Sequence, residues 1–126
     1  MREVIEVLSD SPGSGAAVRR HEWYQIRVNM WLSRGDAVRW TAPWGCAPAR
    51  LDDEGTTLYS QVRFDREYLI AGFFHGCEGM NVGGVRKLKI APHLAFREQG
   101  VQGSVPANAL ITAEIEFLGE GFRSDA

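Results

Sequence analysis

The alternation of apolar and polar residues is clearest in two stretches of the chain, 23–32 and 110–118. In the first stretch every second residue from Tyr24 onward is apolar. In the second, isoleucine, alanine and phenylalanine alternate with threonine and glutamate. A period of two is typical of a β-strand with one buried face. Both stretches are therefore predicted to be strands.

Shorter segments with β-branched and aromatic residues predict further strands. They cover Val4–Leu8, Ala37–Trp40, Thr57–Phe64 and Val85–Ile90. The second of these would be the return strand of a hairpin that turns at 33–36, where glycine and aspartate favour a tight turn.

The spacing of apolar residues changes to three and four after residue 68. This spacing predicts a short amphipathic helix that ends near Gly79. The apolar positions of the helix are Leu69, Ile70, Phe73, Phe74 and Cys77. Thr41–Gly55, with its prolines, glycines and aspartates, is expected to be an irregular flap. Ala91–Asn108 is expected to be a long loop with a helical turn near 93–96.

These elements predict an α+β fold, in which five or six antiparallel strands form a sheet that is curled around one short helix. A single helix cannot cover both faces of a flat sheet, so curling is the economical way to bury its apolar side. The length of 126 residues fits a single domain. Residues 119–126 are polar and are expected to form a frayed end.

Composition excludes several classes of function. The net charge of −2 leaves no basic footprint for nucleic acid or anionic membranes. No apolar run is long enough to cross a bilayer, and the first nine residues do not resemble a signal peptide. We therefore expect a cytoplasmic monomer in which Cys46 and Cys77 stay reduced.

No cofactor or metal is expected from the motifs. Cys46, His75, Cys77 and His93 lack the spacing of a tetrahedral metal site. Tryptophans at 31, 40 and 44 allow three interpretations, a patch that contacts substrate, an interface, or a cover for the edge of the sheet.

An ordered set of motifs in the second half of the chain resembles the FKBP-type peptidyl-prolyl cis-trans isomerase family. The resemblance runs from Glu67 to Leu118, and it is looser in the hairpin at 28–40. The matching motifs are Leu69–Phe73 (LIAGF), Met80–Gly84 (MNVGG), Arg86–Pro92 (RKLKIAP), Leu94–Phe96 (LAF), Val105–Ala109 (VPANA) and the last strand.

The resemblance implies a small apolar pocket that binds proline-containing peptides or proteins and isomerises X–Pro bonds. Such catalysis breaks no covalent bond, and it needs an apolar slot with backbone donors that favours a twisted amide. By the resemblance, the catalytic residues are Ile70, Phe73 and Phe96. The substrate-binding residues are Val28, Val38, Arg39, Leu69, Val101, Val105 and Ala113.

Several pocket positions depart from the family pattern. Phe96 stands in place of a tyrosine, Arg39 in place of an aspartate and Ala113 in place of a phenylalanine, while Val28 replaces a second tyrosine. These departures predict weak or specialised isomerase activity and weak macrolide binding. Two alternatives stay open, a non-catalytic module that binds a protein partner or a small hydrophobic ligand, and a specialised enzyme or accessory protein on the same fold.

Overall fold

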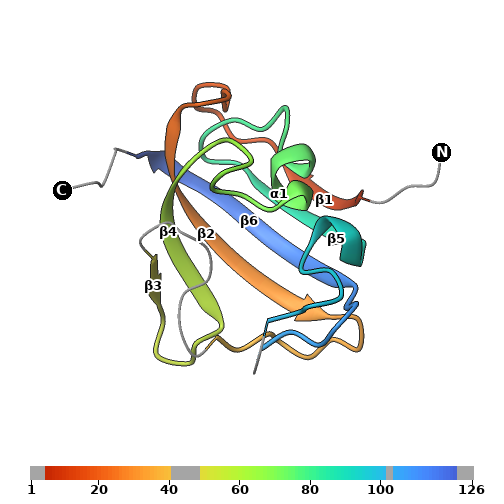
Figure 1. Ribbon diagram of the computed structural model, residues 1–126. Helices are drawn as coiled ribbons and strands as arrows, with labels where there is room; N and C mark the ends of the chain where they lie inside the picture. The colour runs from red at the N-terminus through yellow and green to blue at the C-terminus, as the bar shows by residue number, and fades with distance from the viewer. Residues whose placement is uncertain (1–4, 41–48, 102–103, 122–126) are drawn as a thin grey trace.

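A six-stranded antiparallel sheet forms the body of the protein, with strand order β1-β5-β6-β2-β4-β3 (Figure 1). The computed structural model describes residues 5–40, 49–101 and 104–121. Its elements are β1 (Ile5–Ser11), β2 (Trp23–Leu32), β3 (Ala49–Leu51), β4 (Thr57–Arg63), α1 (Ala71–Gly76), β5 (Val85–Ile90), a short 3-10 helix (Pro92–Leu94) and β6 (Ile111–Glu120). The expected α+β architecture is confirmed. Val4, Trp44 and Cys46, named in the expectations above, lie outside the described residues.

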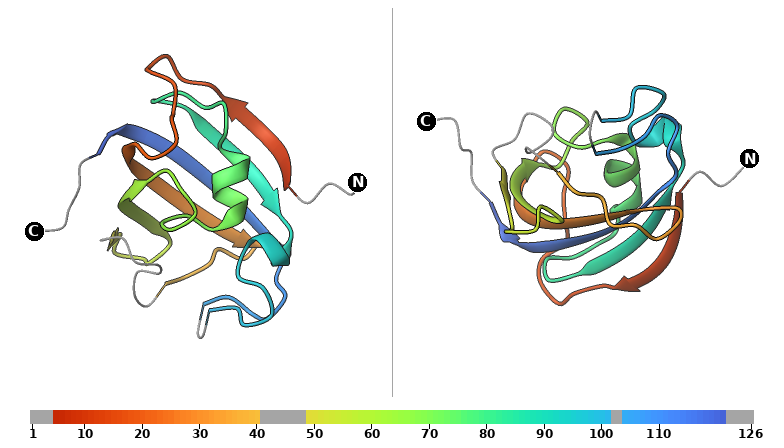
Figure 2. Two further views of the ribbon diagram at one scale, coloured as in Figure 1. Left: turned by 45° about the horizontal axis from the view of Figure 1, so that its top comes forward. Right: turned by 90° about the horizontal axis from the view of Figure 1, so that it is seen from below.

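The sheet bends around α1, which lies on its concave side (Figure 2). The two longest strands, β2 and β6, run side by side through the middle of the sheet, with Val28 opposite Ile115 and Met30 opposite Ala113. These four side chains are at most 1% exposed. The strict alternation in both stretches of sequence therefore places one continuous apolar face against the helix.

The outer face of the sheet is covered by long polar and aromatic side chains. Lys87 lies 4.9 Å above the Trp31 ring. Arg27 donates to Glu116 at 2.9 Å and to Glu114 at 3.2 Å, from one strand to the next. These contacts explain why Arg27 and Trp31, on the outward side of β2, are partly buried rather than exposed.

Two expectations for the segment after β2 are wrong. Residues 37–40 do not form a return strand, because only Ala37 makes an isolated bridge to Trp31 and the Trp40 N–H turns away to the Gly55 carbonyl at 2.8 Å. The segment 41–55 is not wholly irregular, because Ala49–Leu51 forms β3 beside β4. A three-residue edge strand carries too little pattern to be recognised from sequence.

The boundaries of three elements also differ from expectation. The first strand extends to Ser11 and the last to Glu120, so Gly119 and Glu120 are paired rather than frayed. The helix begins at Ala71, because Ile70 has extended backbone angles (φ −62°, ψ 156°) and serves as the N-cap residue. The apolar spacing of Leu69 and Ile70 therefore reflects burial beside the helix rather than helical conformation.

Two glycines let α1 approach β5 closely. A Cβ atom on Gly72 would lie 2.5 Å from Cγ2 of Ile90, and one on Gly76 would lie 2.7 Å from Cδ1 of Leu88. Arg86 of β5 fixes the end of the helix by donating to the carbonyls of Gly76 and Glu78, each at 2.8 Å. These contacts set the distance between the helix and the sheet.

We predict that Gly72→Ala lowers the free energy of unfolding by up to about 2 kcal/mol. The gain in helix propensity, about 1 kcal/mol, is smaller than the cost of overpacking a filled core, about 1–3 kcal/mol. Ile90 is 0% exposed, and the added Cβ would also lie 3.1 Å from the Leu94 carbonyl oxygen. Urea unfolding measures the change, and Gly119→Ala is the control because a Cβ there meets nothing within 4 Å. A Gly72→Ala protein as stable as the parent would contradict this packing.

Candidate functional site

The predicted site residues, with one exception, belong to a single apolar cluster between α1, the sheet and the loop after β5. Six of them are buried in the cluster and three pack against it. The buried members are Val28, Val38, Leu69, Phe73, Val105 and Ala113, and the partly buried members are Ile70, Phe96 and Val101. We call these nine residues the apolar site. Arg39 is the exception, because its side chain is exposed and donates to the Glu54 carbonyl at 3.2 Å.

The apolar site has a buried floor and a partly exposed rim. Phe73 is 0% exposed, so it lies beneath the surface as the structure stands. Ile70, Phe96 and Val101 form the rim and retain some exposure. A ligand therefore meets these three residues first, and it contacts the Phe73 ring only if neighbouring side chains move apart. Phe74 points away from the site and packs 5.2 Å from the Phe64 ring.

A buried aspartate organises the turn that leads into the apolar site. The side chain of Asp65 accepts from the backbone N–H groups of Glu67 at 3.0 Å and Tyr68 at 3.2 Å. It also forms a charged hydrogen bond with Arg63. The Leu69 N–H donates to the Asp65 carbonyl at 3.0 Å. This turn delivers Leu69 and the next residue to the start of α1.

Burial alone would raise the pKa of the Asp65 carboxyl. The hydrogen bond from Arg63, the backbone donors of Tyr68 and Glu67, and the Arg63 charge outweigh burial and hold that pKa below its ordinary value. The ionised carboxylate is therefore the form that the folded protein favours.

Ile70 presents a backbone donor at the rim. Its carbonyl accepts from the N–H groups of Phe73 and Phe74, each at 3.0 Å. Its own N–H has no acceptor within residues 5–40, 49–101 and 104–121. A helix begins with N–H groups that lack intrahelical partners, and here the one that precedes α1 lies beside an apolar wall. It is therefore placed to donate to a ligand carbonyl.

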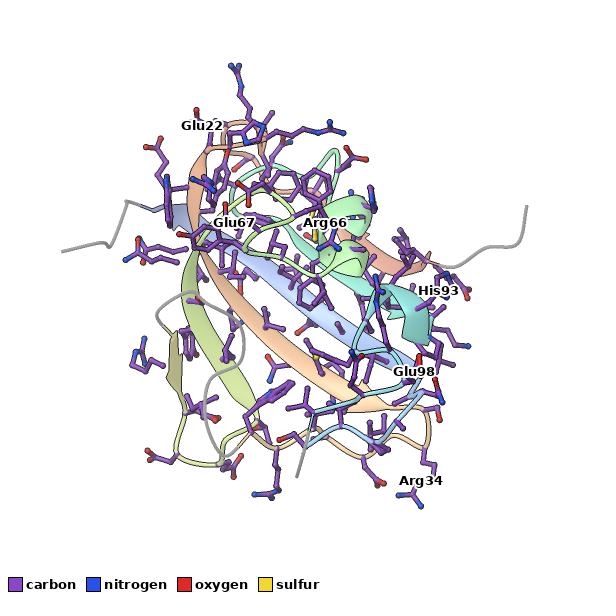
Figure 3. All side chains as sticks on the ribbon, in the orientation of Figure 1. Glu22, Arg34, Arg66, Glu67, His93 and Glu98 are labelled. Atoms are coloured by element: carbon purple, nitrogen blue, oxygen red, sulfur yellow. The ribbon has the colours of Figure 1, made fainter. Side chains whose placement is uncertain are left out.

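The other wall of the apolar site comes from the loop after β5. The 3-10 helix Pro92–Leu94 starts this loop, and Val101 and Val105 close it through a backbone bridge with N–H to O distances of 2.8 and 2.9 Å. In Figure 3, His93 and Glu98 mark this loop, while Arg66 and Glu67 mark the turn before α1. The two segments carry the polar residues that flank the apolar rim.

Trp40 is a residue of this region whose role the sequence left open. Its ring lies 5.9 Å from that of Phe96 in an edge-to-face arrangement, and the residue is 4% exposed. It is part of the core rather than a cover for the sheet edge, and Trp31 lies on the opposite face. An isolated tryptophan before an irregular segment gives no periodic signal, so sequence alone could not place it.

Histidine, cysteine and acidic side chains are the next groups to consider in the part of the chain that the structure describes. No group of three or more histidine, cysteine or acidic side chains is arranged to hold a metal ion among those residues. Burial raises the pKa of the Cys77 thiol to about 12, so it stays protonated near neutral pH and is a poor nucleophile. None of the helices described is long and apolar enough to span a bilayer.

The protein has a curved antiparallel sheet around one short helix, with an apolar site between the helix and a loop. Comparisons with known proteins identify the family that has this fold. The family model described as FKBP-type peptidyl-prolyl cis-trans isomerase matches residues 51–118, more than half of the chain. The chain therefore belongs to this family.

Two relatives with higher identity match over a shorter segment. The FK506-binding protein 1A of Neurospora crassa is 45% identical over 51 residues, which are 40% of this chain and 42% of that protein. The chloroplastic peptidyl-prolyl cis-trans isomerase FKBP16-4 of Arabidopsis thaliana is 43% identical over 54 residues, 43% of this chain and 23% of that protein. The matched segments thus span less than half of these relatives.

Solved structures share the fold over nearly the whole chain. AtFKBP13 superposes with a TM-score of 0.67 at 19% identity, over 93% of this chain and 91% of that chain. A peptidyl-prolyl cis-trans isomerase from Pseudomonas syringae superposes with a TM-score of 0.64 at 17% identity, over 94% and 74%. The loosely matching first half of the sequence therefore still adopts the family fold.

We predict that Asp65→Asn lowers the free energy of unfolding by about 1–3 kcal/mol at neutral pH, because it removes the charge that Arg63 and the backbone donors stabilise. The stability from ionised Asp65 is fully present above its unfolded pKa, near 3.8, and is lost as pH falls through the lower folded value. Urea unfolding across the acid range measures this, with exposed Asp53→Asn as control. Parallel curves for Asp65→Asn and the parent through the acid range would exclude the proposed role.

Proposed function

We propose that this protein is a prolyl isomerase that acts on X–Pro bonds of polypeptides at the apolar site. The observation that carries the proposal is the N–H of Ile70, which is available at the rim of an apolar cluster. Membership in the FKBP-type family supports the same activity. The expected catalytic residues, Ile70, Phe73 and Phe96, belong to one cluster together with the expected substrate-binding residues other than Arg39.

The physical basis of the activity is the barrier to amide rotation, about 18–20 kcal/mol, which arises from resonance. Twisting the amide reduces its charge separation, so an apolar surrounding stabilises the twisted form relative to the planar one. The rim provides apolar contacts for a proline ring through Ile70, Phe96 and Val101. The Ile70 N–H would hold a neighbouring carbonyl while the bond turns.

Two features support a weak or specialised activity. Phe96 has no hydroxyl to donate, and a hydrogen bond of this kind contributes about 0.5–1.5 kcal/mol, or up to about tenfold in rate. Phe73 is fully covered, so binding must displace side chains before the floor is reached. Part of the binding free energy is therefore spent on opening the site.

The covered floor also favours a second candidate function, a module that binds a partner without catalysis. The Phe96 ring, which the buried Trp40 ring contacts edge-to-face from the core, presents aromatic surface at the rim. Such a surface suits recognition of an apolar side chain that does not reach Phe73. Weak macrolide binding, a monomeric state, a role in protein folding and a cytoplasmic location remain predictions.

We predict that Ile70→Pro lowers kcat/KM toward an Ala–Pro peptide at least about tenfold, because proline removes the N–H donor. The native φ of −62° at this position suits the proline ring. Isomerisation is measured by NMR exchange spectroscopy on the peptide. Ile70→Val keeps the donor and is the matched control. Equal activity of the two variants would show that the donor has no part in catalysis.

We predict that Phe96→Tyr raises the isomerisation rate up to about tenfold by supplying a hydroxyl donor at the rim. A proline-limited refolding assay measures the rate, with urea unfolding to confirm unchanged stability. Activity in the parent with no gain in the variant would mean that this rim works without a hydroxyl. No acceleration by either protein over buffer would reject the isomerase and favour the binding module.

A further inference from the structure

A groove crosses the outer face of the sheet, on the side turned away from α1. Its volume is about 370 Å³, and it is lined by Gln25, Ile26, Arg50, Tyr59, Ser60, Gln61 and Leu118. A volume of this size lies at the small end of the range for ligand sites, about 300–1,000 Å³. The residues come from β3, β4, β2 and β6, so the groove runs across the strands.

The strand register explains why the face is hollowed here. Gly119, Gln25 and Gln61 form one row across β6, β2 and β4, whereas Arg27, Tyr59 and Arg50 form a row across β2, β4 and β3. Gly119 has no side chain, and a Cβ there would meet nothing within 4 Å. No side chain therefore projects from the Gly119 end of this row, which leaves open space above the outer face of the sheet.

An irregularity in the pairing of β6 adds an apolar contact to the groove. The register between β2 and β6 shifts after Gln25, which pairs with Gly119, whereas Ile26 pairs with Phe117. Leu118 lies at this shift without an opposite residue and is 45% exposed. The outward alternation of β6, through Thr112, Glu114 and Glu116, places Leu118 on this face, and the register shift leaves it without an opposite residue on β2.

The groove also holds a positive charge that no described carboxylate neutralises. The Arg50 guanidinium lies 4.6 Å from the centre of the Tyr59 ring, which limits its freedom to move. Arg27 in the same row is paired with Glu114 and Glu116, but within the described parts of the chain Arg50 makes no ion pair. A held, uncompensated guanidinium is suited to a carboxylate.

We propose that this groove binds a polypeptide segment that presents a carboxylate next to an apolar side chain. Arg50 would pair with the carboxylate and Leu118 would contact the apolar side chain. The Gln25 side-chain amide donates to the Glu120 carbonyl at 3.0 Å, and its oxygen can accept from the backbone of a bound segment. Arginine and tyrosine are also the residue types that most often dominate the energy of protein interfaces.

The test uses the full chain, labelled with ¹⁵N and ¹³C, and the peptide Ac-Gly-Asp-Leu-Gly-NH₂. The peptide contains no proline, so the result does not depend on the proposed isomerase activity. We expect saturable chemical-shift changes at the side-chain amides of Gln25 and Gln61 and at the Leu118 methyl groups. The neutral peptide Ac-Gly-Asn-Leu-Gly-NH₂ should bind about tenfold more weakly, because the charge-assisted hydrogen bond is lost.

Two variants and a control locate the binding. Arg50→Gln should weaken binding of the aspartate peptide about tenfold and abolish its preference over the asparagine peptide. Gly119→Leu should fill the groove and abolish binding. Arg34→Gln, which changes an exposed arginine in the turn after β2, should leave binding unchanged (Figure 3).

Three results would overturn the proposal. They are an absence of saturable shifts at millimolar peptide, equal affinity for the two peptides, and shifts confined to the apolar site around Ile70 and Phe96. If Gly119→Leu loses its native spectrum, the peptide affinities of Arg50→Gln alone test the proposal. Arg50 is exposed, so its replacement leaves the core intact.

Discussion

The packing of α1 against β5 is the contact on which the rest of the molecule depends. Gly72 and Gly76 carry no side chain toward Ile90 and Leu88, so the helix lies close to the strand. From the same strand, Arg86 donates to the carbonyl of Gly76 at the end of the helix and to that of Glu78 just beyond it. With the helix fixed at this distance, the sheet can curve around it, and Phe73 becomes the buried centre of the apolar site.

The segments that flank the helix turn this packing into a candidate site. Asp65 anchors the turn before α1 and so determines where Leu69 and Ile70 lie. The loop closed by Val101 and Val105 supplies the opposite wall. Among the described residues the site combines apolar surface with the backbone donor of Ile70, which is the chemistry that the proposed rotation about an amide requires.

The two faces of the sheet have different physical character, which separates the two proposed sites. The concave face is apolar and is used by the helix and the candidate isomerase site. The outer face carries a network of Arg27, Glu114 and Glu116 and, next to it, the groove with Arg50, which pairs with no carboxylate of the described residues. A ligand on the outer face meets polar groups first, whereas one at the apolar site meets Ile70 and Phe96.

The sequence by itself determined the long strands, the short helix and the membership of the apolar site. Alternation with a period of two fixes which face of a strand is buried, and this held for β2 and β6 because both face one core. The ordered motifs after residue 67 were enough to expect the family fold. The candidate site residues were predicted from their positions relative to the family motifs, not from any pattern of charge or spacing.

Only the tertiary structure decided what depends on contacts between distant residues. The edge strand β3, the position of Trp40 against Phe96, the exposure of Arg39 and the complete burial of Phe73 are of this kind. The groove is also of this kind. It forms where Gly119 of β6, the register shift between β6 and β2, and Arg50 of β3 lie on one face of the sheet. None of these features repeats along the chain, so the local sequence pattern does not predict them. They arise only when the sheet folds around its helix.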